Sequence, residues 1–440
     1  MMRANWNIPQ RLFEKITGCL RLAGLSASAS AVRGGLLVVL VILASFGFLS
    51  LAQSNPSIGF EVSHGWTATP AEVKGLADAA KGVTAESWIS AAKTYSHDCS
   101  VAGSSCDTKH TAIDTQARVM ADALESQTDP GGSLDGIDAF VLIGHSQGTL
   151  RNRAALQFGY LDQDLSAKTI GIINVGSPGA GAPIIPNGTR FLAYIKYNLD
   201  LATYGVWRAF AGIGVLLSAD FRNALFAAEA MTPSKSDMAP GSSFISRLNQ
   251  DKVDRCRYVR RSVWVGWLWW RHKEFRWVRV CERVPANNRI PGHVAVLDIA
   301  GTNNKFSSLM PGAYNHIHGL GYPMSVAAVG FWSISWQIWP IPIAVGLTNL
   351  SYTMLTFDDQ WQARVVGSRE GDATVTLSSQ LALGDRQYLL EDPSLYSYRR
   401  VKTTHGAEPG NAEVHSAIYR FFMKDNHRGA HAAYTKLHNP

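Results

Sequence analysis

The order of apolar and polar positions predicts buried strands that alternate with helices. Several segments stay mostly apolar over the length of a strand, which is typical of parallel strands covered on both faces. Elsewhere apolar residues recur at spacings of three and four, which indicates helices with one buried face. The predicted strands are Gly59–Ser63, Ala139–Ile143, Thr169–Val175 and His293–Ile299, and the predicted helices include an alanine-rich stretch to about Lys81, residues 111–127 and a final helix, Ala412–Met423.

This alternation predicts an α/β fold with a mostly parallel central sheet and helices on both faces. Ligands bind such sheets beyond the carboxyl ends of the strands. Because the motifs follow one another in a single order, residues 53–440 are expected to form one elaborated domain. Two stretches, at about residues 185–290 and 301–365, do not fit a minimal sheet and are predicted to be insertions.

The first insertion contains a stretch, Lys252–Val284, that intersperses tryptophans with arginines. It predicts a β-hairpin, and a disulfide between Cys256 and Cys281 could join its two strands. Apolar rings beside a cationic fringe suit the headgroup layer of a membrane. The alternative interpretation is a hairpin that lies over the protein's own core.

The second insertion carries no charged residue from Phe306 to Thr356. Trp332, Trp336 and Trp339 stand at helical spacing, which predicts a short apolar helix within a cap or lid. A straight transmembrane span is the weaker interpretation, because prolines would interrupt it. These prolines are Pro311, Pro323, Pro340 and Pro342.

Residues 1–52 predict export. Basic residues outnumber the single acid, Glu14, ahead of the uncharged run Leu36–Ala52, and this order is typical of a signal peptide or an N-terminal membrane anchor. Small residues permit cleavage after Ala52, and the run is also near the lower limit of about 17 residues for a bilayer span. The protein is expected to be secreted or anchored in the membrane, the alternative being a buried core helix.

The cysteines agree with an oxidising compartment. Beyond Cys19, four cysteines remain, and four can pair completely. Local pairing of Cys99 with Cys106 and of Cys256 with Cys281 is favoured, although four cysteines allow three connectivities. A metal site is the lesser interpretation, because neither pair has the close spacing of a zinc knuckle.

Composition narrows the class of protein further. Apolar residues make up 46% of the chain and charged residues 17%, so an extended disordered chain is excluded. The formal net charge of +7 and the pI near 9.1 favour association with anionic surfaces. We expect contact with a membrane or lipid interface through the tryptophan-rich insertions, and no nucleic acid partner.

The segment Gly144-His145-Ser146-Gln147-Gly148 directly follows the apolar run Ala139–Ile143 and matches the pattern G-x-S-x-G. Where this pattern joins a buried strand to a helix, a sharp turn projects the serine at the top of the sheet. The flanking glycines leave room for the neighbouring strand and helix. The sequence therefore predicts Ser146 as a nucleophile.

A serine hydroxyl needs a base, and the base needs an orienting acid. With the chain order serine, acid, histidine that belongs to this turn, Asp372 is predicted as the acid and His405 as the base. His415 is a rival base on the predicted closing helix, where it is expected to face solvent. The rival acids are Asp358, Asp359, Asp385 and Asp392.

Two backbone N–H groups are needed to stabilise the oxyanion of the reaction. One is expected from Gln147, the residue after the nucleophile, at the start of the following helix. The other is expected from Trp66, after His64-Gly65. His64 itself is predicted to be a structural residue of that turn.

These residues resemble those of the bacterial triacylglycerol lipases and related esterases of the α/β-hydrolase superfamily. The resemblance rests on His64-Gly65-Trp66, on the serine segment, on Val175-Gly176-Ser177-Pro178-Gly179 and on Asp372 with His405. It implies an α/β-hydrolase fold and ester hydrolysis through an acyl-enzyme. The apolar cap or lid is expected from the composition and position of the two insertions, which have no matched counterpart in the family. Two departures are Thr149, where many members have glycine, and Ala373, which replaces the glycine common after the acid.

The sequence thus predicts a serine esterase or lipase that cleaves lipid-like carboxylic esters. No cofactor is expected to be required, and a structural calcium is left open without assigned ligands. One alternative is an acyltransferase that uses the same triad. Another is a membrane-associated binding protein built on an inactive hydrolase scaffold.

Overall fold

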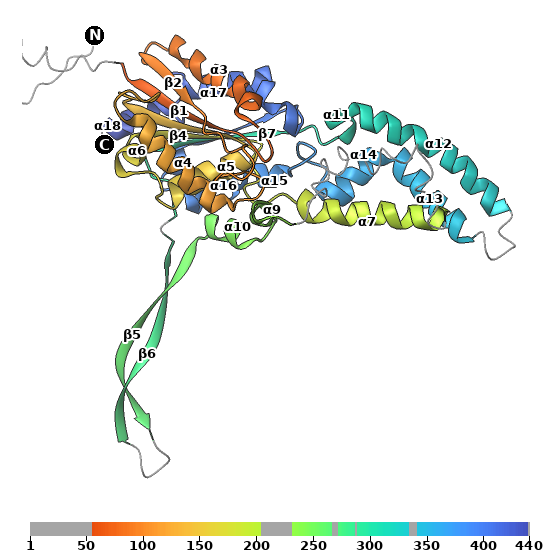
Figure 1. The fold of residues 1–440 in the computed structure, drawn as a ribbon. Coiled ribbons are helices and arrows are strands. Elements are labelled where there is room, and N and C mark those ends of the chain that lie inside the picture. The colour runs from red at the N-terminus through yellow and green to blue at the C-terminus, as the bar shows by residue number, and fades with distance from the viewer. Residues whose placement is uncertain (1–54, 204–230, 266–271, 287, 334–340, 439–440) are drawn as a thin grey trace, which may run out of the picture. The chain divides into compact units, whose positions relative to one another are not determined.

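The structure is a computed structural model that describes residues 55–203, 231–265, 272–286, 288–333 and 341–438 (Figure 1). These residues all belong to one compact unit, Asn55–Pro440. The segment predicted to direct export, residues 1–52, lies outside the described residues.

A six-stranded sheet forms the centre of the unit, in the order β2-β1-β3-β4-β7-β8. Every neighbouring pair in this sheet runs parallel. This arrangement confirms the predicted α/β class with its parallel sheet. The strands are β1 (Ser57–Ser63), β2 (Ala91–Tyr95), β3 (Ala139–His145), β4 (Thr169–Val175), β7 (Ala295–Gly301) and β8 (Tyr396–Val401).

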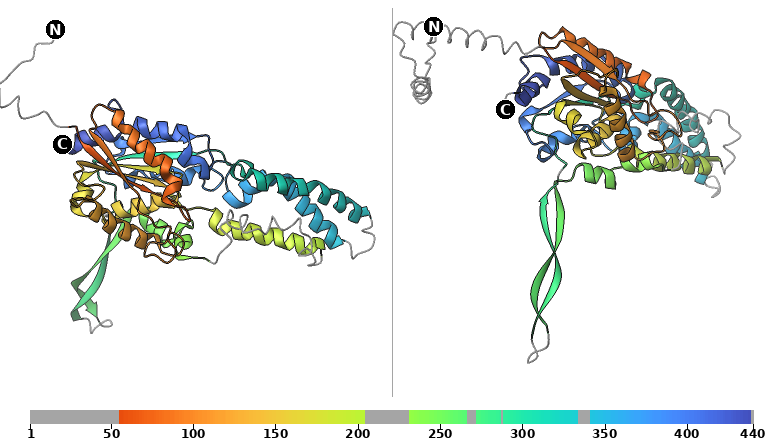
Figure 2. Two further views of the ribbon diagram at one scale, coloured as in Figure 1. Left: turned by 45° about the horizontal axis from the view of Figure 1, so that its top comes forward. Right: turned by 60° about the vertical axis from the view of Figure 1, so that its left-hand side comes forward.

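Helices cover both faces of the sheet, as two separate apolar clusters show. Successive side chains of a strand point to opposite faces; accordingly Val141 and Ile143 of β3 belong to one cluster, and Phe140 and Leu142 to the other. The first face packs against α3 (Lys74–Gly82), α17 (Ala412–Phe422) and α18 (Ala430–His438), and the second against α4 (Ile113–Thr128), α5 (Gln147–Gln157) and α6 (Gln163–Lys168) (Figure 2).

Three elements were not expected from the sequence. The edge strand β2 is half-buried throughout, and β8 buries only its first and last residues, so neither shows a long apolar run. The prediction that the helix beginning at Ala412 ends the fold is wrong, because α18 follows it and contributes Ala430 and Ala433 to the core. Alanine buries little area, so its pattern is a weak signal.

The predicted hairpin is present in the first insertion as β5 (Lys252–Val265) and β6 (His272–Pro285), which pair antiparallel along their whole length. Their register places Cys256 directly opposite Cys281. The side chains of Phe275 and Trp277 are 65% and 68% exposed, so these two rings do not lie over the protein's own core. Figure 1 shows the hairpin as a long twisted ribbon.

Long helices form the rest of the insertions. Trp332, the first tryptophan of the predicted short helix, lies near the end of α12 (Pro311–Ser333), which has 23 residues and contains Pro323; the short helix itself stays a prediction. A proline inside a helix removes one backbone hydrogen bond, and the turns on both sides persist where α12 packs against α13 (Ile341–Leu355). In turn, α13 packs against α7 (Ile184–Thr203). Trp336 and Trp339 lie outside the described residues.

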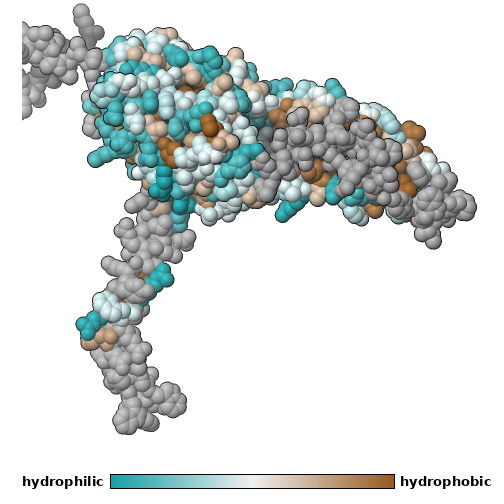
Figure 3. All heavy atoms as spheres, viewed as in Figure 1, coloured by the Kyte–Doolittle hydropathy of each residue, from teal (hydrophilic) through white to brown (hydrophobic). Residues whose placement is uncertain are grey.

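Within the described ranges, no helix combines the length and hydropathy that a membrane crossing requires. The outer side of α12 is nevertheless apolar. Tyr322, Val326 and Val329 are each more than 60% exposed and stand at spacings of four and three, so they share one helical face. Figure 3 shows hydrophobic residues gathered over this group of helices.

A cluster of aromatic side chains packs together at the base of the second insertion. The fully buried Trp361 lies 4.6 Å from Phe306 and 6.3 Å from Phe357 between ring centroids. These residues come from α11, α14 and a short π-helix that follows it. The short helices of the unit are η1 (Pro70–Val73), η2 (Val83–Ala85), α9 (Pro233–Met238), α10 (Ser243–Leu248), α11 (Phe306–Leu309), α14 (Phe357–Gln360), η6 (Trp361–Val366), α15 (Leu377–Gln380), α16 (Ala382–Asp385), η7 (Gln387–Leu389), η8 (Pro393–Leu395) and η9 (His405–Gly410).

Candidate active site

Ser146 lies at the sharp turn between β3 and α5, with φ 54° and ψ −126°. This left-handed backbone is costly for a residue with a side chain, and close packing enforces it. A Cβ atom on Gly148 would lie 2.5 Å from the carbonyl oxygen of Ser63, and one on Gly144 would lie 2.6 Å from the nitrogen of Thr149. Only glycine fits at these two positions.

The structure brings Ser146, His405 and Asp372 together. His405 Nε2 lies 2.8 Å from Ser146 Oγ, and His405 Nδ1 lies 2.7 Å from Asp372 Oδ2. The backbone N–H of His405 also donates to the carbonyl of Asp372 at 2.9 Å. With Nδ1–H donating to the carboxylate, Nε2 is the acceptor that faces the serine hydroxyl. This is the arrangement that a serine nucleophile needs.

The acid loop is held from several sides. Asp372 is fully buried, and its Oδ1 accepts the N–H groups of Thr374 and Val375 at 2.9 and 2.7 Å. Ala373 has a left-handed φ of 72°, a conformation that glycine adopts at a lower cost than a residue with a side chain. Its N–H donates to Asn304 Oδ1 and its carbonyl accepts from Trp361 Nε1, so the strained residue is fixed at both ends.

Three of the rival residues have other partners. Asp358 accepts hydrogen bonds from the N–H and hydroxyl of Ser307, and Asp392 pairs with Lys436 at 2.6 Å. His415 is partly buried on α17, where its Nε2 lies 2.7 Å from the carbonyl oxygen of Pro409. The expectation that His415 faces solvent is therefore only partly correct.

The turn predicted to supply one oxyanion donor lies against the nucleophile. A Cβ atom on Gly65 would lie 3.0 Å from Ser146 Cβ and 3.4 Å from Ser146 Oγ. Trp66 follows directly, and Gln147 opens α5 on the other side of the serine. The first N–H groups of a helix have no partner within it. Both predicted donors are thus on elements that meet at Ser146.

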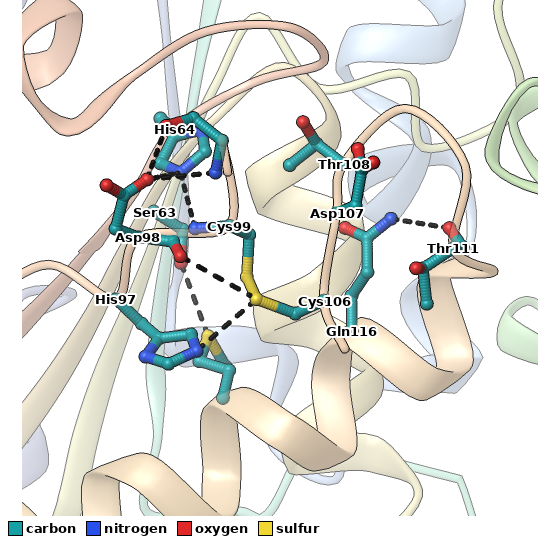
Figure 4. Close-up of a disulfide and its surroundings, with 12 residues drawn as sticks. Ser63, His64, His97, Asp98, Cys99, Cys106, Asp107, Thr108, Thr111 and Gln116 are labelled. Atoms are coloured by element: carbon teal, nitrogen blue, oxygen red, sulfur yellow. Dashed lines mark hydrogen bonds and ion pairs between the residues drawn. A yellow bond between two sulfur atoms is a disulfide. The ribbon is translucent and has the colours of Figure 1, made fainter. Parts of the chain in front are cut away.

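A hydrogen-bond network and a disulfide brace this turn (Figure 4). His64 is fully buried; its Nε2 accepts the N–H of Cys99 at 3.2 Å, and its Nδ1 lies 3.2 Å from the carbonyl oxygen of Gly65. Burial, together with the charge of Arg151, lowers the pKa of His64 to about 4, so the ring is neutral near pH 7. Cys99 is bonded to Cys106, which confirms that predicted pairing.

Replacing both Cys99 and Cys106 by alanine is expected to lower the free energy of unfolding by about 2–3 kcal/mol, because the bridge closes a short loop in the unfolded chain. Chemical denaturation of the variant and the parent, both unreduced, measures this difference. Equal midpoints and slopes for the two proteins would show that the bridge does not stabilise the fold.

Thr149 has a distinct role in place of glycine. Its hydroxyl donates to the carbonyl of Ser146 at 2.7 Å and lies 2.7 Å from the hydroxyl of Ser177. The Val175 carbonyl accepts the N–H of Ser146 at 2.9 Å. The stretch that follows β4 is therefore tied to the serine turn from two positions.

Sequence reasoning missed one acidic residue at this site. Glu408 is fully buried on η9, one helical turn after the predicted base. Its Oε2 lies 3.6 Å from His405 Nδ1 and 3.3 Å from His145 Nε2. The spacing of three between His405 and Glu408 on a helix was the signal that could have placed them on one side.

Among the described residues, two groups of side chains are close enough to share a metal ion: His97 with Cys99 and Cys106, and His145 with His405 and Glu408. The sulfurs of the first group are joined in the disulfide. The second contains two imidazoles, whereas calcium takes oxygen ligands. Neither group supplies the ligand set that the open calcium prediction would require.

No protein-family model matches the sequence, and no curated protein matches it. Among solved structures, the mature lipase BlEst2 of Bacillus licheniformis is 12% identical over 84% of this chain and 93% of that one, with a TM-score of 0.39. The phospholipase PlaB of Legionella pneumophila is 15% identical over 44% and 35% of the two chains, with a TM-score of 0.25. A cutinase-like protein from Cryptococcus sp. is 14% identical over 30% and 58%, with a TM-score of 0.21.

The fold itself rests on the chain's own features. Six parallel strands are covered by helices on both faces. The strained Ser146 joins the third strand of the chain to a helix. A sheet of this kind with a serine turn at its carboxyl edge is the α/β-hydrolase fold.

Proposed function

We propose that the protein is a serine hydrolase that cleaves carboxylic esters through an acyl-enzyme. The observation that carries this proposal is the continuous contact from Ser146 Oγ through the His405 ring to Asp372, at 2.8 and 2.7 Å. Activation by a base that is itself oriented by a third group turns a weak hydroxyl into a nucleophile. The same contacts weigh against an inactive binding scaffold.

In this mechanism His405 Nε2 removes the proton from Ser146 Oγ as the oxygen attacks the ester carbonyl. Asp372 holds the ring and stabilises the imidazolium that forms. The carbonyl oxygen becomes an oxyanion that the N–H groups of Trp66 and Gln147 stabilise. His405 gives the proton to the leaving alcohol, which leaves an acyl-enzyme on Ser146. His405 then removes a proton from water, the water oxygen attacks the acyl carbonyl, and the proton returns to Ser146 Oγ as the acid is released.

A lipid-like substrate is supported by where the uncharged insertion joins the site. It leaves the sheet at Gly301, where an added Cβ would lie 2.7 Å from Asp372 Cβ, and its base is bonded to the acid loop through Trp361. The insertion thus begins and ends beside the predicted triad. Its exposed apolar face on α12, with Phe275 and Trp277 on the hairpin, suits a lipid surface.

We also propose that the protein works outside the cytoplasm, secreted or anchored by its N-terminal segment. The Cys99–Cys106 disulfide supports this location, because such bonds persist in oxidising compartments. Transfer of the acyl group to an added alcohol in place of water would identify an acyltransferase on the same triad.

Labelling with a fluorophosphonate probe tests the proposal. The parent is expected to react with the probe, and Ser146→Ala to lose the label, because only an activated serine attacks phosphorus at a useful rate. Ser416→Ala, which changes an exposed serine on α17, is the matched control and should label like the parent. A folded parent that stays unlabelled, or a labelled Ser146→Ala, would contradict the proposed nucleophile. Screening esters from short to long chains then defines the acyl preference.

A further inference from the structure

Glu408 is a buried titratable group beside the predicted triad that the proposed mechanism does not use. It is fully buried, and among the described residues neither of its oxygens has a hydrogen-bond partner of good geometry. The nearby N–H of Gly301 donates to Gln380 Oε1 at 2.8 Å. A buried carboxylate without donors is strongly disfavoured, because it loses its hydration without compensation. Burial therefore favours the protonated form of Glu408, beside the neighbouring acid Asp372.

The fold has built a space for this carboxyl group. A Cβ atom on Gly176 would lie 2.0 Å from Glu408 Oε2, and one on Gly301 would lie 2.4 Å from Glu408 Oε1. Gly176 directly follows β4 and Gly301 is the last residue of β7, so both lie at the edge where ligands bind such sheets. Two backbone positions without side chains thus border one acid and bring it beside His405.

We propose that Glu408 is a positioning residue that carries a proton and donates it in a hydrogen bond to the Asp372 carboxylate, which keeps that carboxylate directed at His405. The proposal rests on the proposed serine hydrolase function. The two acidic side chains meet at Gly301, where an added Cβ would contact both Glu408 Oε1 and Asp372 Cβ. Two neighbouring carboxyl groups can share a hydrogen bond only if one of them holds the proton.

The groups around Glu408 assign the proton to it. Asp372 already accepts hydrogen bonds from two backbone N–H groups and from the His405 ring, all of which stabilise its charged form. Burial and the neighbouring charge of Asp372 raise the pKa of Glu408 well above its ordinary value.

The third ionisable neighbour, His145, does not supply a compensating charge. Burial and the neighbouring His405 lower the pKa of His145 to about 3. Its Nε2 lies 3.0 Å from the carbonyl oxygen of His405, which requires a hydrogen on that nitrogen. The neutral ring therefore contacts Glu408 at 3.3 Å without forming an ion pair. Glu408 is thus surrounded by one negative charge and two imidazole rings.

The role of the proton is to keep Asp372 in place while His405 becomes positively charged during the reaction. An ionised Glu408 would repel Asp372 and remove this hydrogen bond. Geometric errors of about 1 Å at such a position lower rates by roughly 100-fold. The device acts on the orientation of the base, and it leaves substrate binding unchanged.

Two substitutions test whether Glu408 acts as a hydrogen-bond donor or only through the volume of its side chain. Glu408→Gln keeps a neutral donor of the same shape, and it is expected to retain kcat within about threefold at neutral pH. Glu408→Leu has a similar volume and no donor, and it is expected to lower kcat about 10- to 100-fold with KM unchanged. Equal losses of kcat in the two variants would overturn the proposal. Both variants lack a carboxylate at this position, so equal losses would indicate that the ionised form of Glu408 is the one required.

A second measurement does not depend on catalysis. The folded protein holds a proton on Glu408 that the unfolded chain releases above the ordinary value of 4.5. The free energy of unfolding therefore falls as pH rises from that value toward the raised pKa. Glu408→Gln lacks this loss, so its stability relative to the parent should increase with pH. Infrared spectra at neutral pH should also show a protonated carboxylic acid that Glu408→Gln lacks.

Labelling by the fluorophosphonate probe in the same preparations distinguishes the two proposals. A parent that does not label contradicts the hydrolase function, whereas the infrared and stability measurements still test the proton on Glu408. A parent that labels, together with a Glu408→Gln variant whose relative stability does not change with pH and whose spectrum keeps the acid band, contradicts the role of Glu408 alone.

Discussion

Replacing His405 by alanine is expected to lower kcat for ester hydrolysis by about 10⁴- to 10⁶-fold, close to the loss caused by Ser146→Ala. The serine and its base act as one unit, so removing either leaves only the contribution of the oxyanion donors and of binding. Steady-state kinetics with a soluble ester measures the effect. The fluorophosphonate label should fall in parallel, because the probe reacts with the same activated hydroxyl.

His415→Ala is the matched control for this variant. His415 is the rival base and lies on α17, where it contacts the carbonyl of Pro409. Its removal is expected to change kcat by less than about threefold, because the effect of substitutions away from special features is small. A large loss in His415→Ala with an active His405→Ala would reverse the assignment of the base.

Replacing Trp361 by alanine is expected to lower the free energy of unfolding by about 3–5 kcal/mol, as large-to-small changes of buried rings do. Trp361 is fully buried between Phe306 and Phe357. The variant also leaves the carbonyl of Ala373 without the indole donor. Because Ala373 is strained and follows Asp372, kcat should fall together with stability.

Thermal and chemical unfolding of Trp361→Ala, with kinetics well below its melting temperature, separates the two effects. Trp332→Ala is the control: this ring is 45% exposed on α12, and its loss should cost about 1 kcal/mol or less. A Trp361→Ala protein with parental stability would show that the ring cluster does not support the base of the insertion.

The interior of the fold was predictable because its strands are covered on both faces. β4 coincides with the predicted segment Thr169–Val175, and the predicted core of β3 lies within the observed strand. The edge strands were not predictable in the same way. A strand such as β8 exposes its middle residues, so its pattern does not differ from that of a polar loop.

The predicted site residues were reachable from sequence because each stands in a local pattern. The turn around Ser146 needs glycines at fixed places, and the order serine, acid, histidine then restricts the choice of Asp372 and His405. Glu408 has no such local pattern. Its place depends on Gly176 and Gly301, which lie at the ends of β4 and β7, and such contacts exist only after folding.

The length of chain between Ser146 and His405 also governs how the protein is made. These residues are in hydrogen-bond contact across a sequence separation of 259. At about 5–20 residues per second, roughly 13–52 s pass between their synthesis. Throughout that interval the nascent chain carries Ser146 without its base. The ester-cleaving chemistry proposed for this site is therefore withheld from the ribosome-bound polypeptide until the second half of the molecule has joined the first.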